Sequence, residues 1–450
     1  MEKKIERFIN IVQDYLSSNA VVKLQRFLNK LHTADVADVI SHLEAEEGQK
    51  ILNMLKPEVT AEVLNEVDSV LAKKLVQAMS PIRLSKMLDT MPPDNAADIL
   101  QYLPEGEHLK VLAQMTEEEA AEEVAELIQY DKDTAGGIMT TEFVSFHEDA
   151  TVADTLEYLR KDMDVEAGYY IYTTDREDHL RGVVTLKKLI MADPDKRLKN
   201  VMISDIISVK PDSDQEYVAN LVAKYDLLAV PVTDASNRLL GIITVDDIID
   251  VIREEATEDV YKSVGTTEDE LLTKSSFNVA KIRLPWLITT LLGGLICVLV
   301  VSRFKFVLEQ VIALAFFMPI IAAMGGNIGI QSSTIVVRGL ATGIIDTKKV
   351  WKMLFREVRI GAIMGLACGA VVGTVGVLWQ RQLVLGLVLF VSMFMAIIVA
   401  AAIGAIIPLV FNKFNIDPAI ATGPFVTTAN DITGMLIYFS LALGLMKYLV

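Results

Sequence analysis

The sequence predicts a multidomain protein that combines an all-α helical superhelix, tandem α/β domains and a polytopic α-helical membrane domain with five spans. Apolar residues recur at helical spacing through the first part of the chain, where strand-like patterns are rare. Two similar units of short strands and helices follow, and the last third contains apolar segments of about 20 residues or more, the length that crosses a bilayer. We expect a helical domain at 1–132, α/β domains at 133–200 and 201–252, a connecting, plug-like helix at 253–282 and a membrane domain at 283–450.

The charge of the chain is divided sharply between its two parts. The 450 residues carry a net charge of −17, yet from Arg283 onward 12 basic residues outnumber 5 acidic ones. The preceding part therefore holds 30 basic and 54 acidic residues, a net charge of −24. Such a surface repels itself and attracts cations, whereas binding nucleic acid requires basic residues to neutralise phosphates. We expect cations as partners and no nucleic acid.

The first 132 residues contain a loose internal repeat. The segment 33–40 resembles 93–100, because each places an acid at the start of an expected helix and another acid shortly after it. Repeated helix pairs of this kind predict a small solenoid. Asp94 and Asp98 share one face of the second segment, where they could contact a divalent ion together with another acidic surface. The alternative is a solvated helix face whose acids favour the helix dipole.

Two α/β units follow the glycines at 136–137. Each contains an apolar strand, at 168–172 and 229–232, and a second strand that begins with a glycine, Gly182 or Gly241, and runs into a helix. Amphipathic helices are expected at 151–161 and 215–225. The repeated strand, ending Gly-[Val/Ile]-[Val/Ile]-Thr before a helix, resembles a pair of CBS domains, which are regulatory modules that often bind nucleotides. Whether this pair binds an adenine nucleotide is left open by the sequence.

The last helix of the second α/β unit carries a stripe of acids toward the membrane domain. Asp247, Asp250, Glu254 and Glu258 follow one another at three- and four-residue spacings, so they lie on one face. Oxygen ligands suit hard cations such as Mg²⁺, and a charge-driven switch in this position could act on the membrane domain. A solvated linker helix is the alternative.

Five spans are expected, near 284–302, 311–337, 360–379, 383–411 and 421–446. Basic residues crowd the loop between the second and third spans, which places that loop in the cytoplasm: Lys348, Lys349, Lys352, Arg356 and Arg359. The start of the chain lacks the apolar core of a signal peptide, so the long soluble part is also expected in the cytoplasm. An odd number of spans then puts the C-terminus outside a multi-pass plasma-membrane protein.

One carboxylate, Asp431, stands in the middle of the last apolar segment. A central Asp costs roughly 2.5–3.5 kcal/mol on insertion scales, so such a residue normally faces a partner or water. Thr427 and Thr428 precede it by four and three residues and Gly434 follows by three, which places all four on one helical face. This face is a plausible lining for a cation pathway, and the alternative is a structural salt bridge from Asp431 to Arg338 or Lys447.

The second expected span is interrupted by Pro319 and by the polar run Gly-Gly-Asn-x-Gly-x-Gln at 325–331. Amides at bilayer depth are tolerated only against protein or water. Asn327 and Gln331 share a face, where their oxygens would suit a hydrated ion, since Mg²⁺ keeps several of its waters. Alternatively, the glycines serve helix packing.

Taken in order, the acidic helical domain, the CBS pair, the linking helix and the motifs Gly-Gly-Asn-x-Gly-x-Gln and Asn-Asp-x-Thr-Gly closely resemble the MgtE family of magnesium channels over essentially the whole chain. The resemblance implies a homodimer with a pore at the subunit interface, where Asp431 of each subunit holds hydrated Mg²⁺. Residues expected to line the pore with it are Asn430, Thr427, Thr428, Asn327 and Gln331. The resemblance also implies a cytosolic Mg²⁺ sensor made of Asp94, Asp98, Glu216, Asp226, Asp247, Asp250, Glu255, Glu258, Asp259 and Asp417.

These expectations give a hypothesis for gating. Abundant cytosolic Mg²⁺ bridges acidic faces and holds the linking helices against the pore, and loss of Mg²⁺ lets repulsion open it. A CBS-regulated transporter of Mn²⁺, Co²⁺ or another solute and a membrane-tethered sensor without transport are the alternatives. An enzyme is not expected, because the sequence contains no Cys/His cluster, P-loop or nucleophile motif.

Overall fold

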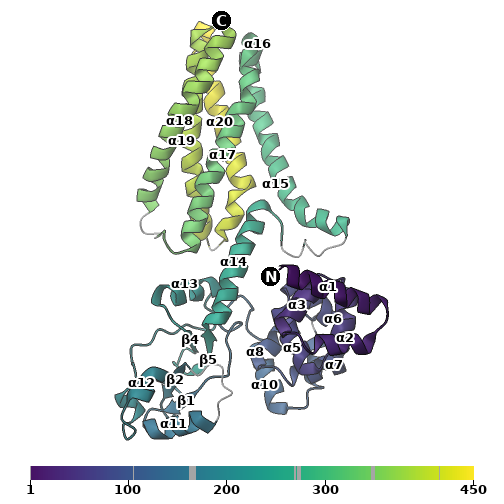
Figure 1. The fold of residues 1–450 in the computed structure, drawn as a ribbon. Helices are drawn as coiled ribbons and strands as arrows, with labels where there is room; N and C mark the ends of the chain where they lie inside the picture. The colour runs from purple at the N-terminus through teal and green to yellow at the C-terminus, as the bar shows by residue number, and fades with distance from the viewer. Residues whose placement is uncertain are drawn as a thin grey trace. The chain divides into compact units, whose positions relative to one another are not determined.

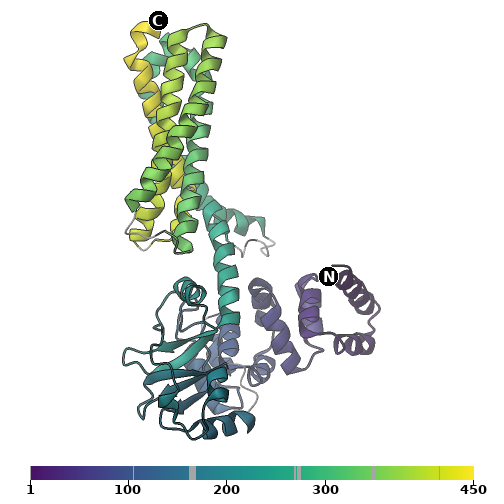
Figure 2. The ribbon, with the colours of Figure 1, turned by 60° about the vertical axis from the view of Figure 1, so that its left-hand side comes forward.

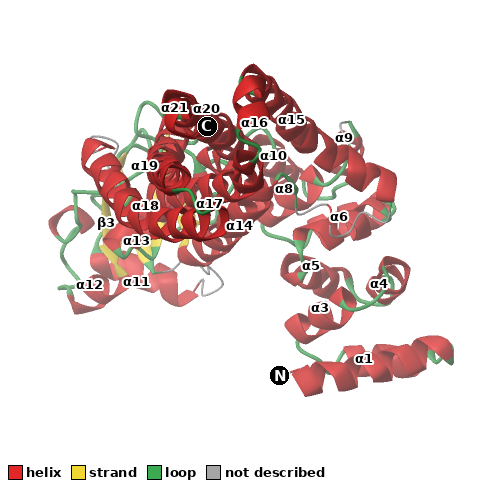
Figure 3. Cartoon of the chain, turned by 90° about the horizontal axis from the view of Figure 1, so that it is seen from above, coloured by secondary structure: helices red, strands yellow, loops and turns green. Residues whose placement is uncertain are grey.

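The structure is a computed structural model that describes residues 2–104, 106–161, 169–267, 270, 275–345, 350–414 and 416–449. The chain forms two compact units, Met1–Arg253 and Glu254–Val450. Strands among the described residues occur only between Ser145 and Thr244, in the second half of unit 1, and are yellow in Figure 3. Everything else that is regular in the described residues is helical.

Unit 1 begins with short helices and, in its described residues up to 132, contains no strand (Figure 1). They are α1 Glu2–Ser17, α2 Val21–Leu28, α3 Thr33–Ser41, α4 Ala45–Leu52, α5 Pro57–Glu66, α6 Ser69–Gln77, α7 Pro81–Leu88, α8 Pro93–Gln101, α9 Glu107–Leu112 and α10 Glu118–Leu127. Proline starts α5, α7 and α8 because its fixed φ suits the first helical position and its missing N–H needs no partner there. An all-helical beginning is thus confirmed.

The internal repeat in this part is visible in burial. Helix α3 buries Val36, Val39 and Ile40, and α8 buries Ala96, Ile99 and Leu100 at the same spacings. Each helix also carries an Asp in its first turn, Asp35 in α3 and Asp94 in α8. The same amphipathic helix is therefore used twice.

Two small sheets make up the rest of unit 1. In the first, β1 Ser145–His147 pairs in parallel with β2 Tyr170–Thr174, which pairs antiparallel with β3 Leu180–Thr185. The second sheet is an antiparallel pair, β4 Ala229–Thr233 and β5 Leu239–Thr244. Helices in this part are α11 Val152–Lys161, α12 Leu186–Met191, η1 Leu198–Asn200 and α13 Gln215–Tyr225. The tandem α/β arrangement is confirmed, with the strand expected at 168–172 lying two residues later; Gly168 is outside the described residues.

The two matched glycines explain part of this repeat. A Cβ on Gly182 would lie 2.4 Å from the sulfur of Met202, and one on Gly241 would lie 3.0 Å from the sulfur of Met139. Met202 belongs to the second repeat and Met139 to the first, so each repeat fills the gap above the other's glycine. Only a residue without a side chain admits this contact.

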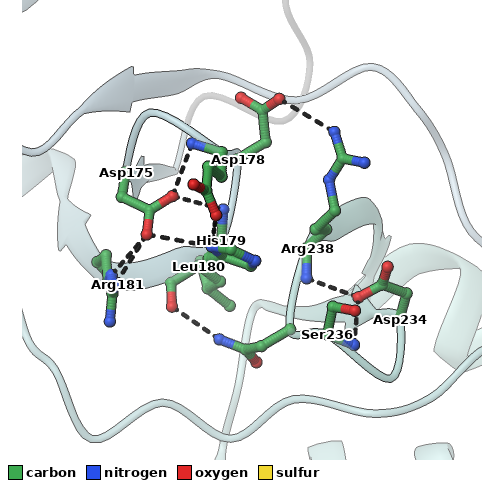
Figure 4. A network of polar contacts seen from close by, with 10 residues as sticks. Asp175, Asp178, His179, Leu180, Arg181, Asp234, Ser236 and Arg238 are labelled. Atoms are coloured by element: carbon green, nitrogen blue, oxygen red, sulfur yellow. Dashed lines mark hydrogen bonds and ion pairs between the residues drawn. The ribbon is translucent and has the colours of Figure 1, made fainter.

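The hairpin turns of the two sheets meet in a polar network (Figure 4). Asp175 Oδ1 accepts hydrogen bonds from the backbone N–H groups of Glu177 and His179, and Asp234 Oδ1 accepts from those of Ser236 and Arg238. The turns are tied to each other by backbone bonds from Leu180 N–H to Asn237 O (2.9 Å) and from Leu239 N–H to Asp178 O (3.1 Å). Short Asp side chains stabilise tight turns through such bonds. The backbone bonds between the two turns then fix the β2–β3 hairpin against the β4–β5 hairpin.

Helix α14, Val245–Val264, follows β5 and crosses the boundary between the units. Unit 2 continues with α15 Ser276–Arg303, α16 Lys305–Gln310, α17 Ala313–Ala341, α18 Val350–Gln380, α19 Leu383–Lys413, η4 Pro418–Thr422, α20 Pro424–Gly444 and α21 Met446–Leu449. Figure 2 shows α17–α20 running side by side as long, nearly parallel rods. Lys348 and Lys349 of the expected basic loop lie outside the described residues.

Helices α17–α20 enclose the core of unit 2. Phe317, Leu389, Tyr438 and Phe439 are completely or almost completely buried among them. Helices α18 and α19 approach closely because glycines recur every four residues on α18; a Cβ on Gly365 would lie 2.9 Å from the carbonyl oxygen of Phe394. By contrast, α15 buries only Gly293 of its described residues and leaves apolar side chains exposed along its length.

Four helices of the described residues are long and apolar enough to cross a membrane: α15, α17, α18 and α19. Helix α20, with 21 residues, is not among them. The expected fifth span at 421–446 therefore stays a prediction. The polar residues of α20 that motivate a pore are the same residues that weaken its apolar character.

Candidate metal sites

Asp431 lies near the middle of α20, half-buried, and its carboxylate makes no ion pair within the residues that the structure describes. Neither Arg338 nor Lys447 pairs with it there. Thr427, one turn earlier, donates from Oγ1 to the carbonyl oxygen of Gly423 at 3.0 Å, which leaves the hydroxyl oxygen free to accept. A carboxylate and a threonine oxygen thus share one face of α20 without a protein cation.

Asn430 has a different environment from its neighbour. Its side chain is 2 % exposed, and Nδ2 donates to the carbonyl oxygen of Gly325 on α17 at 3.2 Å. A Cβ on Gly329 would lie 1.9 Å from the same nitrogen. The amide therefore lies in the interior of the subunit and braces α20 against α17, so its predicted contact with a pore ion would need the side chain to turn.

We expect Gly329→Ala to destabilise unit 2, here also called the membrane unit because it contains the four apolar helices long enough to cross a membrane, by about 1–3 kcal/mol. The added methyl group must displace the Asn430 amide. Thermal unfolding of the full chain in detergent measures this loss. Gly294→Ala is the matched control, because a Cβ at Gly294 meets nothing within 4 Å. Equal melting temperatures for the two variants would contradict the packing role of Gly329.

Asn327 and Gln331 lie on the opposite side of α17 and are exposed on the surface of the subunit. Between them and along the same helix, Gly325, Gly329, Ser332 and Ser333 face inward and are buried. The Gly-Gly-Asn-x-Gly-x-Gln motif thus has two faces, one for packing against α19 and α20 and one of exposed amides. The packing role suggested for the glycines is present, whereas the contact of Asn327 and Gln331 with a hydrated ion stays a prediction.

Helix α15 contacts α20 beside Asp431. A Cβ on Gly293 would lie 2.3 Å from Oγ1 of Thr428, so this threonine packs directly on the α15 backbone. One turn further along α15, the thiol of Cys297 approaches the carbonyl oxygen of Asp431 at 3.8 Å. Thr428 is therefore turned toward α15, whereas Thr427 and Asp431 remain together on the α20 face.

In unit 1 the structure brings together two predicted sensor residues that are far apart in sequence. Asp94 is in the first turn of α8 and Asp247 in the first turn of α14. Burial raises the pKa of Asp247 to about 6, and the negative charges of Asp246 and Asp94 act in the same direction. Thr244 opposes the shift by donating from Oγ1 to Oδ2 at 2.5 Å. Two carboxylates in a partly desolvated position fit a hard divalent cation, which would offset their mutual repulsion.

A second group of predicted residues meets in unit 2, where Glu258 and Asp259 of α14 lie near Asp417. The ammonium group of Lys262 contacts Glu258 Oε1 at 2.5 Å and Asp417 Oδ2 at 2.7 Å. Burial and the charge of Asp417 raise the pKa of Asp259, while Arg338 and Lys262 lower it. Three of the predicted carboxylates therefore lie near one another, and two of them, Glu258 and Asp417, pair with a lysine.

Comparison with known proteins matches the order of the parts along the chain. Family models match residues 31–133 as the MgtE intracellular N domain, 135–195 and 198–254 as CBS domains, and 318–441 as a divalent cation transporter. The magnesium transporter MgtE of Bacillus subtilis is 39 % identical over 323 residues, which cover 72 % of each chain. That of Enterococcus faecalis is 40 % identical over 331 residues, 73 % of each chain.

The chain belongs to the MgtE family. Among solved structures, the cytosolic domain of the Mg²⁺ channel MgtE in complex with ATP is 34 % identical and superposes with a TM-score of 0.50, covering 53 % of this chain and 98 % of that one. The helical and CBS parts of unit 1 thus have the MgtE fold, and the family places the apolar helices of unit 2 in a membrane.

The remaining predicted MgtE sensor residues are spread over the surface rather than gathered. Glu216 lies in the first turn of α13, and Asp226 ends that helix in a left-handed conformation, φ 52°. Asp98 and Asp250 are exposed on α8 and α14, and Glu255 is half-buried on α14. In the described part of the chain no three His, Cys, Asp or Glu side chains converge closely enough to hold a metal ion.

Sequence reasoning missed two charged residues in the membrane unit. Lys262 is one, although its i, i+4 spacing from Glu258 was a usable signal. Glu357 is the other: it is 2 % exposed, and Ser332 Oγ donates to its Oε2 at 2.9 Å. Its place one turn before Gly361, on the glycine-bearing face of α18, could have indicated that it points inward.

Proposed function

We propose that this protein is a Mg²⁺-selective channel that works as a homodimer in the plasma membrane and is closed by cytosolic Mg²⁺. The observation that carries the proposal is Asp431, a carboxylate in the middle of α20 with no ion pair in the described residues. An unpaired charge at such depth normally faces water or an ion pathway. Membership of a family whose relatives are named magnesium transporters supports Mg²⁺ as the cargo.

The donor set on α20 favours a hydrated ion. Asp431 offers one charge, and the Thr427 hydroxyl oxygen can accept a hydrogen bond from a water molecule of the ion. Mg²⁺ dehydrates reluctantly and is usually held through one or two carboxylates and several waters. Two subunits would supply two Asp431 carboxylates, whose charge balances that of one Mg²⁺ ion.

The surface of α17 supports a dimer. Asn327 and Gln331 are exposed amides on a helix that is apolar enough to span a bilayer. Amides facing lipid are unfavourable, because the bilayer core offers them no hydrogen-bond partners. A second copy, with a water-filled path between the copies, removes this cost and places both amides at the pathway. The α20 helix is then the fifth span and the C-terminus lies outside.

Regulation is proposed to act through the acidic residues of unit 1 and of α14. Asp94 and Asp247 are close enough to repel each other, and Mg²⁺ between them stabilises their approach. Helix α14 is continuous from Asp247 to the cluster at Lys262, which makes it suited to carry a change in unit 1 to the membrane unit. Mg²⁺ shifts the channel to the closed state only if it binds that state more tightly.

The CBS pair is proposed to bind an adenine nucleotide. The support is the similarity of unit 1 to the cytosolic domain of an MgtE channel solved with ATP. Binding of ATP to the full chain, measured by isothermal titration, addresses this part separately from transport.

The proposal is tested by Mg²⁺ uptake into proteoliposomes at low Mg²⁺ on the side of the soluble domains. We expect uptake well above that of protein-free vesicles, and weak competition by Mn²⁺ and Co²⁺. Strong inhibition by either ion, with its own uptake, would favour a transporter of that ion. Absence of any divalent-ion uptake by folded protein would favour a membrane-tethered sensor.

A further inference from the structure

The C-terminal end of α14 contacts η4, the short helix that precedes α20, and Lys262 makes the central ion pair of this contact. Lys262 bridges Glu258 on its own helix, at 2.5 Å, and Asp417, at 2.7 Å. The other oxygen of Asp417, Oδ1, accepts a hydrogen bond from the N–H of Ala419 at 2.8 Å and begins η4. This short helix leads through Gly423 into α20.

Two neighbouring contacts join the same elements. Thr422 Oγ1 donates to the carbonyl oxygen of Ser263 at 3.4 Å, one residue beyond Lys262. The ring of Trp286, on α15, lies against Gly265 at the end of α14 and against Gly423 at the start of α20; added Cβ atoms would lie 2.2 Å and 2.5 Å from it. The position of α14 is thus linked through three contacts to the start of the helix that carries Asp431.

Lys262 stands where a divalent cation would be expected to bridge. The resemblance to the MgtE family implied that Glu258, Asp259 and Asp417 are sensor ligands, and two of them, Glu258 and Asp417, already pair with the ammonium group of Lys262. The side chains of Lys262 and Asp417 are each about one-third exposed, 33 % and 30 %, so an ion from the cytosol can reach them. An ammonium group is a compact cation with three donors, whereas Mg²⁺ carries twice the charge and demands six oxygen ligands.

We propose that Lys262 is a resident cation that occupies the Glu258–Asp417 bridge in the absence of Mg²⁺, and that Mg²⁺ must displace it to bind there. This inference rests on the proposed gating by cytosolic Mg²⁺, and it makes Lys262 the residue that sets the Mg²⁺ concentration at which the channel closes. Lys262 holds α14 against η4 on its own, so the channel is partly closed without Mg²⁺. Because Mg²⁺ competes with an attached charge, a higher Mg²⁺ concentration is needed for full closure.

The consequences for a Lys262→Met variant have definite signs. Loss of the ammonium removes the Mg²⁺-free bridge, so Mg²⁺ flux in the absence of soluble-side Mg²⁺ rises. Glu258 and Asp417 no longer share a resident charge, so Mg²⁺ binds them more tightly and half-suppression needs about two- to fivefold less Mg²⁺, the range of a partly exposed ion pair. Loss of a lysine with a purely structural role would also raise the Mg²⁺-free flux, but it would weaken closure at every Mg²⁺ concentration, so half-suppression would need more Mg²⁺ instead of less.

The experiment measures flux of the full chain in proteoliposomes against soluble-side Mg²⁺ for the wild type, Lys262→Met and Lys262→Arg. Arginine keeps the charge and is expected to stay near the wild type. Lys161→Met is the matched control, because Lys161 makes an i, i+4 ion pair with Glu157 at 2.7 Å on α11, outside the membrane unit. If the methionine variant is poorly folded by gel filtration, Lys262→Gln replaces it.

A second readout is independent of transport. With Trp351 and Trp379 changed to Phe, the fluorescence of Trp286 reports on the contact between α14 and α20. Its Mg²⁺ midpoint should fall in Lys262→Met by the same factor as the flux midpoint. A midpoint that is unchanged or higher in both assays, while Mg²⁺ still suppresses flux in the wild type, overturns the role of Lys262 alone. A wild type that Mg²⁺ does not suppress overturns the proposed gating and this inference together.

Discussion

Replacing Asp431 with alanine is expected to reduce Mg²⁺ flux at least about tenfold, which corresponds to roughly 1.4 kcal/mol or more of lost ion stabilisation. The physical reason is that Asp431 is the only acidic side chain of α20, and no described cation neutralises it. Without this charge, α20 has no acidic side chain to attract a hydrated divalent ion to that face. Flux into proteoliposomes at low soluble-side Mg²⁺ measures the effect.

Two further variants make this prediction specific. Asp431→Asn keeps the shape and hydrogen-bonding oxygen but removes the charge, so it should also lose most of the flux. Glu309→Ala removes another acid of the membrane unit, which is exposed and paired with Lys305 at 3.5 Å, and should leave flux unchanged. Wild-type flux in folded Asp431→Ala would exclude this carboxylate from the pathway.

The second large effect concerns Asp247 and pH. The pKa of this carboxyl in the folded protein is about 6, above its usual value of 3.8. A raised pKa means that the folded state binds the proton more tightly than the unfolded state does. The contribution of protonated Asp247 to the stability of the folded state is therefore fully present below pH 3.8 and is lost as the pH rises through about 6. Without Mg²⁺, this term costs about 2 kcal/mol at pH 7, after allowance for partial exposure.

Mg²⁺ is expected to restore the lost free energy of unfolding at pH 7, where the Asp247 carboxylate is ionised. It should have little effect at pH 5, where that carboxyl group is protonated. Denaturant unfolding of the full chain in detergent, with and without Mg²⁺ at both pH values, measures this. In Asp247→Asn the Mg²⁺-dependent difference should largely disappear, whereas in Asp212→Asn, an exposed site in the turn before α13, it should persist. Equal Mg²⁺ stabilisation at pH 5 and 7 would contradict the role of the ionised Asp247.

The helical and α/β parts of unit 1 were predictable because burial there follows local periodicity. The predicted helix at 215–225 coincides with α13, and the predicted strand at 229–232 with β4 to within one residue. The strand expected at 168–172 lies at Tyr170–Thr174 instead. Its register is determined by the Asp175 turn and by pairing with β3, which are contacts outside the apolar run.

Side-chain direction in the membrane unit was less predictable, because most positions there are apolar on every face. Asn430 and Asp431 are adjacent in the sequence, yet one braces α20 against α17 and the other has no ion pair in the described chain.

Contacts between residues that are remote in the sequence were also not predictable. Asp94 and Asp247 were each expected to bind cations, but their proximity depends on tertiary packing across more than 150 residues. Lys262 went unnoticed because its partner Asp417 is equally remote in sequence.

The most direct test of the account is Mg²⁺ flux through the intact protein in proteoliposomes as a function of Mg²⁺ on the soluble-domain side. We expect flux to be largest when that side is free of Mg²⁺ and to fall steadily to near the level of protein-free vesicles as Mg²⁺ is raised. Flux that is substantial but independent of soluble-side Mg²⁺ would contradict the proposed gating by α14 and the acidic residues of unit 1.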